Sequence, residues 1–197
     1  MPGPVTLVVE GTVDAAVAER LLAEAGWSSG PKHVKQGKAA LDRCLDGYAN
    51  AARFSCWLVL RDLDHDAGCA PELRRKLLRR SSAHFRLHVA VRAVESWLLA
   101  DADAFGRFFG VAPERIPSRP DGLPSPKRTL VELARRSRRR EVREAIVPAA
   151  DSGAQVGPGY TVFVTEFASR HWRPGAAARR SPSLERLRVF LRRVSGR

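Results

Sequence analysis

Residues 55–64 read SCWLVLRDLD, a short apolar run that ends in aspartates. An apolar run of this length, bounded by turn residues, is typical of a strand buried in a parallel sheet. The continuation HDAG places Asp62, Asp64 and Asp66 at alternate positions directly after the run. Like charges at this spacing repel one another, so a fold that keeps them together needs an arginine, a metal ion or solvent exposure to offset the repulsion.

Strand and helix patterns alternate on both sides of this run. Strands are predicted over residues 5–10, 32–36, 55–64 and 85–91, and helices over 12–26, 38–52, 71–80 and 93–110. In the first of these helices, Val13, Val17 and Leu21 fall on one face at helical spacing. Strands and helices in this rhythm predict an α/β fold with a Rossmann-like parallel sheet flanked by helices.

The pattern changes after residue 110. We expect residues 1–110 to form the α/β core and residues 111–197 to form a basic, mainly helical extension packed on it. Residues 111–126 contain five prolines and no periodicity, which is typical of a loop. Further along, helices are predicted over 127–147 (a pattern that allows one break) and 182–194, with a loop over 148–159. Residues 160–172 fit a strand or a helix, and we favour the helix. Ser181 suits the N-cap of the last helix, whose apolar stripe would contain Leu184, Leu187, Leu191 and Val194.

The chain is strongly basic. It has 34 Lys and Arg against 21 Asp and Glu, which gives a formal net charge of +13. The surplus is concentrated in residues 73–80, 135–140 and 170–197. A polyanion such as nucleic acid is the natural partner of such a surface, and solvated helix faces are the alternative interpretation.

Composition argues against a membrane protein. The apolar runs are too short to span a bilayer, and the N-terminus MPGPVTLVVEG lacks the basic start and long apolar stretch of a signal peptide. We therefore expect a cytoplasmic protein with no membrane partner. The oligomeric state cannot be predicted from these features.

The cysteines do not form a metal-binding motif. Cys44, Cys56 and Cys69 include no CxxC pair, and Cys56 is expected to be a small buried residue of its strand. A zinc site could combine His65 and Cys69, which are four residues apart, with His84 and His88, but the usual ligand pairs are missing.

Two predicted strands deliver acids to one edge of the sheet. Glu10 ends the first strand, and Asp62 and Asp64 end the third. Ligands of open α/β sheets gather at the carboxyl ends of the strands. Alternate residues leaving a strand point to one side, so Asp62 and Asp64 could share a divalent cation such as Mg²⁺, which prefers carboxylate, water and phosphate oxygens.

The three aspartates also have explanations that involve no shared Mg²⁺ ion. An exposed turn is one alternative, because Asp and Gly are common in turns. A calcium loop is excluded, because Ala67 and Leu73 stand where it requires Gly and Glu. A dehalogenase-type phosphatase would carry its Asp-x-Asp after the first strand, and here the motif follows the third. A glycosyltransferase could also use Asp-x-Asp, but nothing else in the sequence supports one.

Two motifs together carry a family resemblance. VVEG at 8–11 and VLRDLDHDAG at 59–68 resemble the Toprim domain of topoisomerases, primases and related nucleases. In that family Glu-Gly ends the first strand and Asp-x-Asp, sometimes with a third aspartate, ends a later one. The chain is more similar still to an uncharacterised bacterial family of small Toprim-like proteins, related to the nuclease domains of overcoming-lysogenization-defect proteins. Residues 91–105, 125–133, 156–167 and 171–184 carry this closer likeness, and Arg61 and Ala67 depart from the Toprim pattern.

This resemblance implies a nuclease, or a related phosphoryl-transfer enzyme, that uses Mg²⁺ or Mn²⁺ on DNA or RNA. Glu10, Asp62 and Asp64 would be catalytic and bind the metal, with Asp66 and Glu95 as further ligands. It also implies a role in defence against phage or mobile DNA, beside an ATPase partner. The alternatives are a non-catalytic module that binds nucleic acid or nucleotide, and an accessory subunit with a protein partner.

A second set of residues is predicted to contact phosphate or nucleic acid: Gly11, Arg92, Lys127 and Arg128. Lys127 and Arg128 begin a predicted helix, where cations are unfavourable toward the helix dipole. Contact with a phosphate would explain them, and a solvated first turn is the alternative. Glu95 sits among apolar residues, so it is expected either to bind a metal or to pair with Arg92 three residues earlier.

Overall fold

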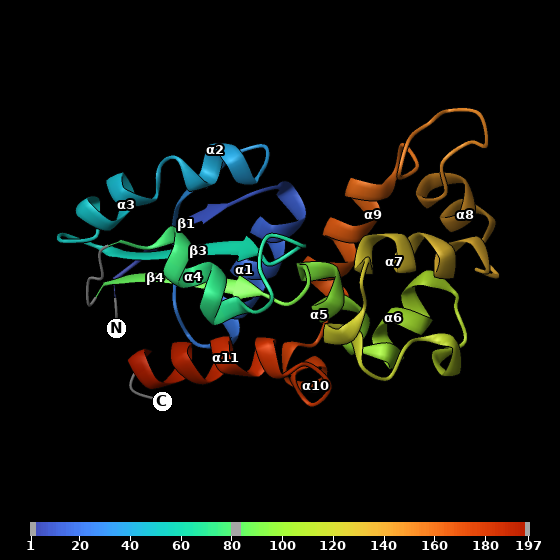
Figure 1. The fold of residues 1–197 in the computed structure, drawn as a ribbon. Helices are drawn as coiled ribbons and strands as arrows, with labels where there is room; N and C mark the ends of the chain where they lie inside the picture. Colours follow the sequence, from blue (N-terminus) through green and yellow to red (C-terminus); the bar gives the residue numbers. More distant parts are fainter. Residues whose placement is uncertain (1–2, 80–83, 196–197) are drawn as a thin grey trace.

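The computed structural model in Figure 1 describes residues 3–79 and 84–195. Its centre is a sheet of four parallel strands in the order β2-β1-β3-β4. The strands are β1 (Val5–Val9), β2 (Ser29–Val34), β3 (Cys56–Asp62) and β4 (Phe85–Ala90). Helices flank the sheet, so the predicted α/β fold class is confirmed.

The helices of the first half follow the predicted order but are shorter. They are α1 (Thr12–Glu24), α2 (Lys38–Asp42), α3 (Leu45–Ala51), α4 (Ala70–Leu77), α5 (Val94–Ala100) and α6 (Ala102–Phe109). The helices predicted over 38–52 and 93–110 are each divided in two. The second division occurs at Asp101, whose Oδ1 accepts a hydrogen bond from the Ala104 N–H at 3.3 Å and so caps α6.

The second half is mainly helical, as predicted. It contains α7 (Pro126–Arg135), α8 (Arg140–Ile146), α9 (Tyr160–Glu166), a π-helix η3 (Phe167–His171), α10 (Pro174–Ala178) and α11 (Pro182–Ser195). The predicted helix over 127–147 is broken once, between α7 and α8. The predicted loop over 111–126 includes two short 3₁₀ helices, η1 (Pro113–Arg115) and η2 (Pro120–Gly122), and α10 was not predicted.

The last helix largely follows its sequence pattern. The Ser181 Oγ accepts a hydrogen bond from the Leu184 N–H at 3.3 Å, which confirms the predicted N-cap. Leu184, Leu187 and Leu191 are buried. Val194 lines a pocket with Leu191 but is 49% exposed, so the apolar stripe is only partly covered on the last turn of the helix.

Apolar side chains pack on both faces of the sheet. On one face Leu7, Leu58 and Leu60 belong to the largest buried cluster, which includes residues of α1, α5, α9 and α11. On the other face Val8 and Val59 pack with residues of α2 and α3. The largest cluster contains residues from both halves of the chain, so the segment after residue 110 is part of the same core.

The carboxyl ends of β3 and β4 point toward a group of helices that includes α5, α7 and α9 (Figure 1). This arrangement places the ends of the strands, and the loops after them, against the second half of the chain. No helix within residues 3–79 and 84–195 combines the length and the apolar character that crossing a membrane would require.

Candidate active site

Glu10 and Asp62 meet at one edge of the sheet, as the strand pattern predicted. Glu10 follows β1 and Asp62 is the last residue of β3, and these two strands are neighbours. The Asp62 N–H donates a hydrogen bond to Glu10 Oε1 at 2.9 Å. Burial raises the pKa of Glu10, although this hydrogen bond and the charge of Arg61 oppose the shift.

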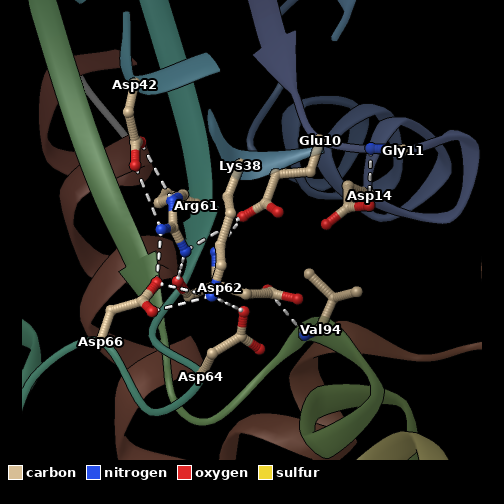
Figure 2. A network of polar contacts seen from close by, with 10 residues as sticks. All are labelled: Glu10, Gly11, Asp14, Lys38, Asp42, Arg61, Asp62, Asp64, Asp66 and Val94. Atoms are coloured by element: carbon tan, nitrogen blue, oxygen red, sulfur yellow. Dashed lines mark hydrogen bonds and ion pairs between the residues drawn. The ribbon is translucent and has the colours of Figure 1, made fainter. Parts of the chain in front are cut away.

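Asp62 points toward other carboxylates. Its Oδ1 accepts a hydrogen bond from the Val94 N–H at 3.1 Å, which ties β3 to the start of α5 (Figure 2). Burial raises the pKa of Asp62 well above its usual range, and the charges of Asp14 and Glu95 raise it further. The free energy of the ionised form is therefore high unless a cation approaches.

Asp14 is a site residue that the sequence analysis missed. It lies in the first turn of α1 and is only 7% exposed. Its Oδ2 accepts a hydrogen bond from the Gly11 N–H at 3.0 Å, while its buried Oδ1 has no hydrogen-bond partner among the described residues. Burial raises the pKa of Asp14 to about 7, with the charges of Glu95 and Glu10 as further causes. The available signal was a carboxylate beside Val13 on the apolar side of a helix, four residues after Glu10.

Glu95 is also buried, with an exposure of 3%. Its Oε1 accepts a hydrogen bond from the Tyr160 hydroxyl at 2.8 Å and lies 3.6 Å from Lys127 Nζ. The charge of Glu95 raises the pKa of Lys127. The predicted pairing of Glu95 with Arg92 was wrong, because the Arg92 side chain instead donates to the backbone carbonyl of Asp64.

Arg61 is the centre of a second network, with its side chain only 2% exposed. Its guanidinium donates to Asp42 Oδ1 at 3.1 Å and to Asp66 Oδ2 at 2.6 Å, and it lies 3.4 Å from Glu10 Oε1. Figure 2 shows Arg61 between the carboxylates of Asp42 and Asp66. Burial acts to lower the pKa of Arg61, but these hydrogen bonds dominate and raise it.

Lys38 extends this network to the loop after β3. Its Nζ donates to Asp66 Oδ1 at 2.8 Å and to Asp64 Oδ2 at 3.1 Å. Burial acts to raise the pKa of Asp66, but the hydrogen bonds from Lys38 and Arg61 dominate and lower it. The three aspartates therefore have different surroundings. Asp66 is neutralised by two cations of the chain and Asp64 bonds to one of them, whereas Asp62 faces other acids.

A pocket of about 340 Å³ opens at this edge of the sheet. Its lining includes six charged residues: Lys38, Asp62, Asp64, Arg92, Glu95 and Lys127. Asp64 has a φ angle of 47°, a left-handed backbone conformation that places it at the turn after β3. Asp62 therefore lines one cavity together with four other predicted site residues: Asp64, Arg92, Glu95 and Lys127.

The other predicted contacts lie elsewhere. The Gly11 N–H is bonded to Asp14, and a Cβ at Gly11 would lie 3.1 Å from Asp14 Oδ2. Arg128 is exposed and is not part of the pocket lining. For both residues, contact with phosphate stays a prediction.

The residues present fit a hard divalent cation. Within the described ranges, no three His, Cys, Asp or Glu side chains already form a metal-binding group, so an ion would have to draw its ligands together. The buried, unpartnered Oδ1 of Asp14 and the raised pKa values of Glu10, Asp14 and Asp62 nevertheless indicate an excess of acceptor oxygens. Glu10, Asp14, Asp62 and Glu95 are the residues that would hold Mg²⁺. For Asp64 and Asp66, which accept hydrogen bonds from Lys38, metal binding stays a prediction.

Comparison of the chain with protein-family models, with curated proteins and with solved structures gave no match in any of the three. The fold and the site define an α/β protein with a pocket lined by acids and cations at the carboxyl edge of a parallel sheet.

Proposed function

We propose that this protein is a Mg²⁺-dependent nuclease, or a related phosphoryl-transfer enzyme, that acts on DNA or RNA. The observation that carries the proposal is the group of buried carboxylates around Asp62, with Lys127 beside it, on a chain of net charge +13. Such a group fits a divalent cation, and the basic surface fits a polyanionic substrate. Mn²⁺ has similar ligand preferences and would serve in place of Mg²⁺.

When bound, the ion would activate a water molecule and neutralise charge on the phosphate as the ester bond breaks. The chain itself supplies position and charge. The hydrogen bonds of Glu10 with the Asp62 N–H, and of Asp62 with the Val94 N–H, hold the two carboxylates in place. Lys127 would stabilise the charge that develops on the phosphate oxygens, because it lines the pocket beside the acids.

Arg92 and Lys38 line the same pocket and would contact phosphates next to the cleaved bond. Contacts of this kind position a strand without reading its sequence. The resemblance to Toprim nucleases supports the same reaction, and we extend the proposal to a cytoplasmic role in defence against phage or mobile DNA, with an ATPase partner.

The test is calorimetric titration with Mg²⁺ and Mn²⁺, combined with incubation of a plasmid and an RNA. The comparison is between the wild type, Asp62→Asn/Asp64→Asn, and the control Asp46→Asn, which changes an exposed residue in the first turn of α3. We expect metal binding and cleavage in the wild type and the control. Cleavage should fall about a hundredfold or more in the double variant, because metal stabilisation of the reaction is worth several kcal/mol. Equal cleavage by the double variant would exclude the proposed site.

A second candidate function is a non-catalytic module that binds nucleic acid. The observation that favours it is the ion-pair network of Arg61 and Lys38, which gives Asp42 and Asp66 a structural role without a metal. This function predicts salt-sensitive binding that does not need Mg²⁺, and no cleavage.

A further inference from the structure

A second pocket, of about 670 Å³, lies along β4. β4 is an edge strand of the sheet, with α4 and α11 in contact with it (Figure 1). Four arginines line the pocket: Arg74 and Arg75 from α4, Arg86 from β4 and Arg186 from α11. Its other lining residues include Leu78, Leu87 and Val89, so apolar side chains line the pocket together with the cations.

The positive charge of this pocket has no counterpart in the lining. No Asp or Glu is among the lining residues, and none of the four arginines forms an ion pair within residues 3–79 and 84–195. By contrast, the neighbouring Arg188 on α11 pairs with Glu24 at 2.8 Å and with Glu185 at 2.6 Å. Convergent like charges from three separate elements raise the free energy of the pocket unless an anion enters it.

Arg86 packs against an aromatic ring. Its guanidinium carbon lies 4.3 Å from the centroid of the Phe190 ring, an arrangement that orients the planar group. Its Nε is buried and has no hydrogen-bond partner in the described part of the chain. Burial and the charge of Arg74 lower the pKa of Arg86, so this guanidinium is poorly stabilised by its own surroundings.

His88 adds no charge to the pocket. Burial lowers the pKa of His88 to about 3, with the charge of Arg86 as a further cause, so the ring is neutral at pH 7. Its Nε2 lies 3.1 Å from the carbonyl oxygen of Ser183, to which it donates. The attraction for an anion therefore comes from the arginines alone.

We propose that the pocket between α4, β4 and α11 binds a phosphate group through Arg74, Arg86 and Arg186. Arginine suits this task because its planar group offers paired donors that match phosphate oxygens. The volume is sufficient for a ligand of nucleotide size, and Leu78 and Leu87 provide an apolar surface beside the cations.

The position of the pocket suggests one source of this phosphate. Arg86 is opposite Leu58 in the sheet, four residues before Asp62, so it lies about 13 Å along the strand from the carboxylate site. A nucleic-acid strand bound at the proposed active site would reach the pocket, and this part of the inference rests on the proposed function. A free nucleotide is the other source of the same chemistry.

The experiment measures binding in metal-free buffer, so that it does not depend on cleavage. The probes are pyrophosphate and AMP, followed by calorimetry, and a fluorescein-labelled single-stranded DNA of twelve nucleotides, followed by anisotropy. The wild type is compared with Arg74→Ala/Arg186→Ala and with Arg140→Ala/Arg170→Ala. Both variants remove two positive charges, but Arg140 and Arg170 are exposed and lie outside the pocket. Thermal unfolding of each variant establishes that it is folded.

We expect affinity for at least one probe to fall about tenfold or more in the pocket variant and less than about threefold in the control. Loss of pyrophosphate or AMP binding would identify a small phosphate ligand, whereas loss confined to the DNA would identify a backbone phosphate. Arg74→Lys/Arg186→Lys should recover only part of the affinity, because lysine cannot donate the paired hydrogen bonds. An equal loss in both double variants, or no binding of any probe by the wild type, would overturn the proposal. Neither result depends on whether the protein cleaves nucleic acid.

Discussion

The Asp62 N–H donates a hydrogen bond to Glu10 Oε1 at 2.9 Å, and this contact between residues 52 positions apart joins the ends of two neighbouring strands. The guanidinium of Arg61 lies 3.4 Å from the same oxygen. Glu10 therefore connects the acidic group around Asp62 with the ion pairs around Arg61. A change in either network should alter the other.

Asp14→Asn should weaken metal binding and stabilise the metal-free protein. The substitution removes a buried charge whose ionisation is opposed by burial, Glu95 and Glu10, so at pH 8 the free energy of unfolding should rise by about 1–3 kcal/mol. The affinity for Mg²⁺ should fall about tenfold. Urea unfolding and calorimetry with Mg²⁺ test these two effects, with Asp46→Asn as the exposed control. Unchanged Mg²⁺ affinity would remove Asp14 from the site.

Arg61→Met should destabilise the fold strongly. The variant leaves Asp42, Asp66 and Glu10 without the cation that they share, and removal of one partner of a buried ion pair typically costs about 3–5 kcal/mol. Urea unfolding at pH 7 provides the measurement. Arg140→Met is the matched control, since Arg140 and Glu144 form an exposed pair and should contribute less than about 1 kcal/mol.

A second substitution tests whether the stability lost in Arg61→Met comes from carboxylates that have lost their cation. Asp42→Asn in the Arg61→Met background should restore part of the lost stability, because it removes the carboxylate whose ion-pair partner was Arg61, whereas Asp66 keeps Lys38. Simple additivity of the two changes would contradict the network described above.

Lys127 and Arg128 are adjacent in sequence but should differ in function. Lys127→Met removes the cation that lies 3.6 Å from Glu95 in the pocket, so kcat/KM for cleavage should fall about a hundredfold. Arg128→Met removes an exposed charge outside the pocket lining, so the loss should stay below about threefold and should disappear at high salt. Equal losses in the two variants would mean that Lys127 acts only through general attraction of the substrate.

Because of the buried His88, the protein should lose stability in acid. Its pKa in the folded protein is about 3, below its ordinary value of 6.5, so the unfolded chain takes up a proton first as the pH falls. The resulting stabilisation is complete above pH 6.5 and is lost progressively toward pH 3, by at most about 1.4 kcal/mol per pH unit.

His88→Gln tests this effect, because the amide can still donate to the Ser183 carbonyl but cannot titrate. Urea unfolding between pH 7 and pH 4 should show a shallower decline for the variant, by about one proton. The same slope in the variant and the wild type would show that other groups cause the acid sensitivity.

Local patterns predicted much of the fold. The apolar runs that form β1, β3 and β4, and the helical spacing of Val13, Val17 and Leu21, are short-range features, and each forms the expected element. Breaks within helices were harder to predict. Asp101 ends a helix because its carboxylate caps the next one and is bonded to Arg173 at 2.6 Å, and that arginine is 72 residues away in sequence.

Local patterns also predicted part of the candidate site. Glu10 and Asp62 come together because adjacent parallel strands end at one edge, and the strand pattern contains that information. The burial of Asp14 depends on how α1 packs against later helices. The partners of Glu95, which are Lys127 and Tyr160, belong to α7 and α9.

The sequence by itself determined the strands, most of the helices, the basic surface and the two acids that end β1 and β3, because these follow from neighbouring residues and their spacing. Only the tertiary structure decided which aspartates pair with a cation of the chain and which lie among other acids. Arg61, noted in the sequence only as a departure from the Toprim pattern, is a buried partner of Asp66, whereas Asp62 faces Asp14 and Glu95. The physical reason is that the free energy of a charge depends on its burial and on the charges around it, and both are set by segments that are distant in sequence.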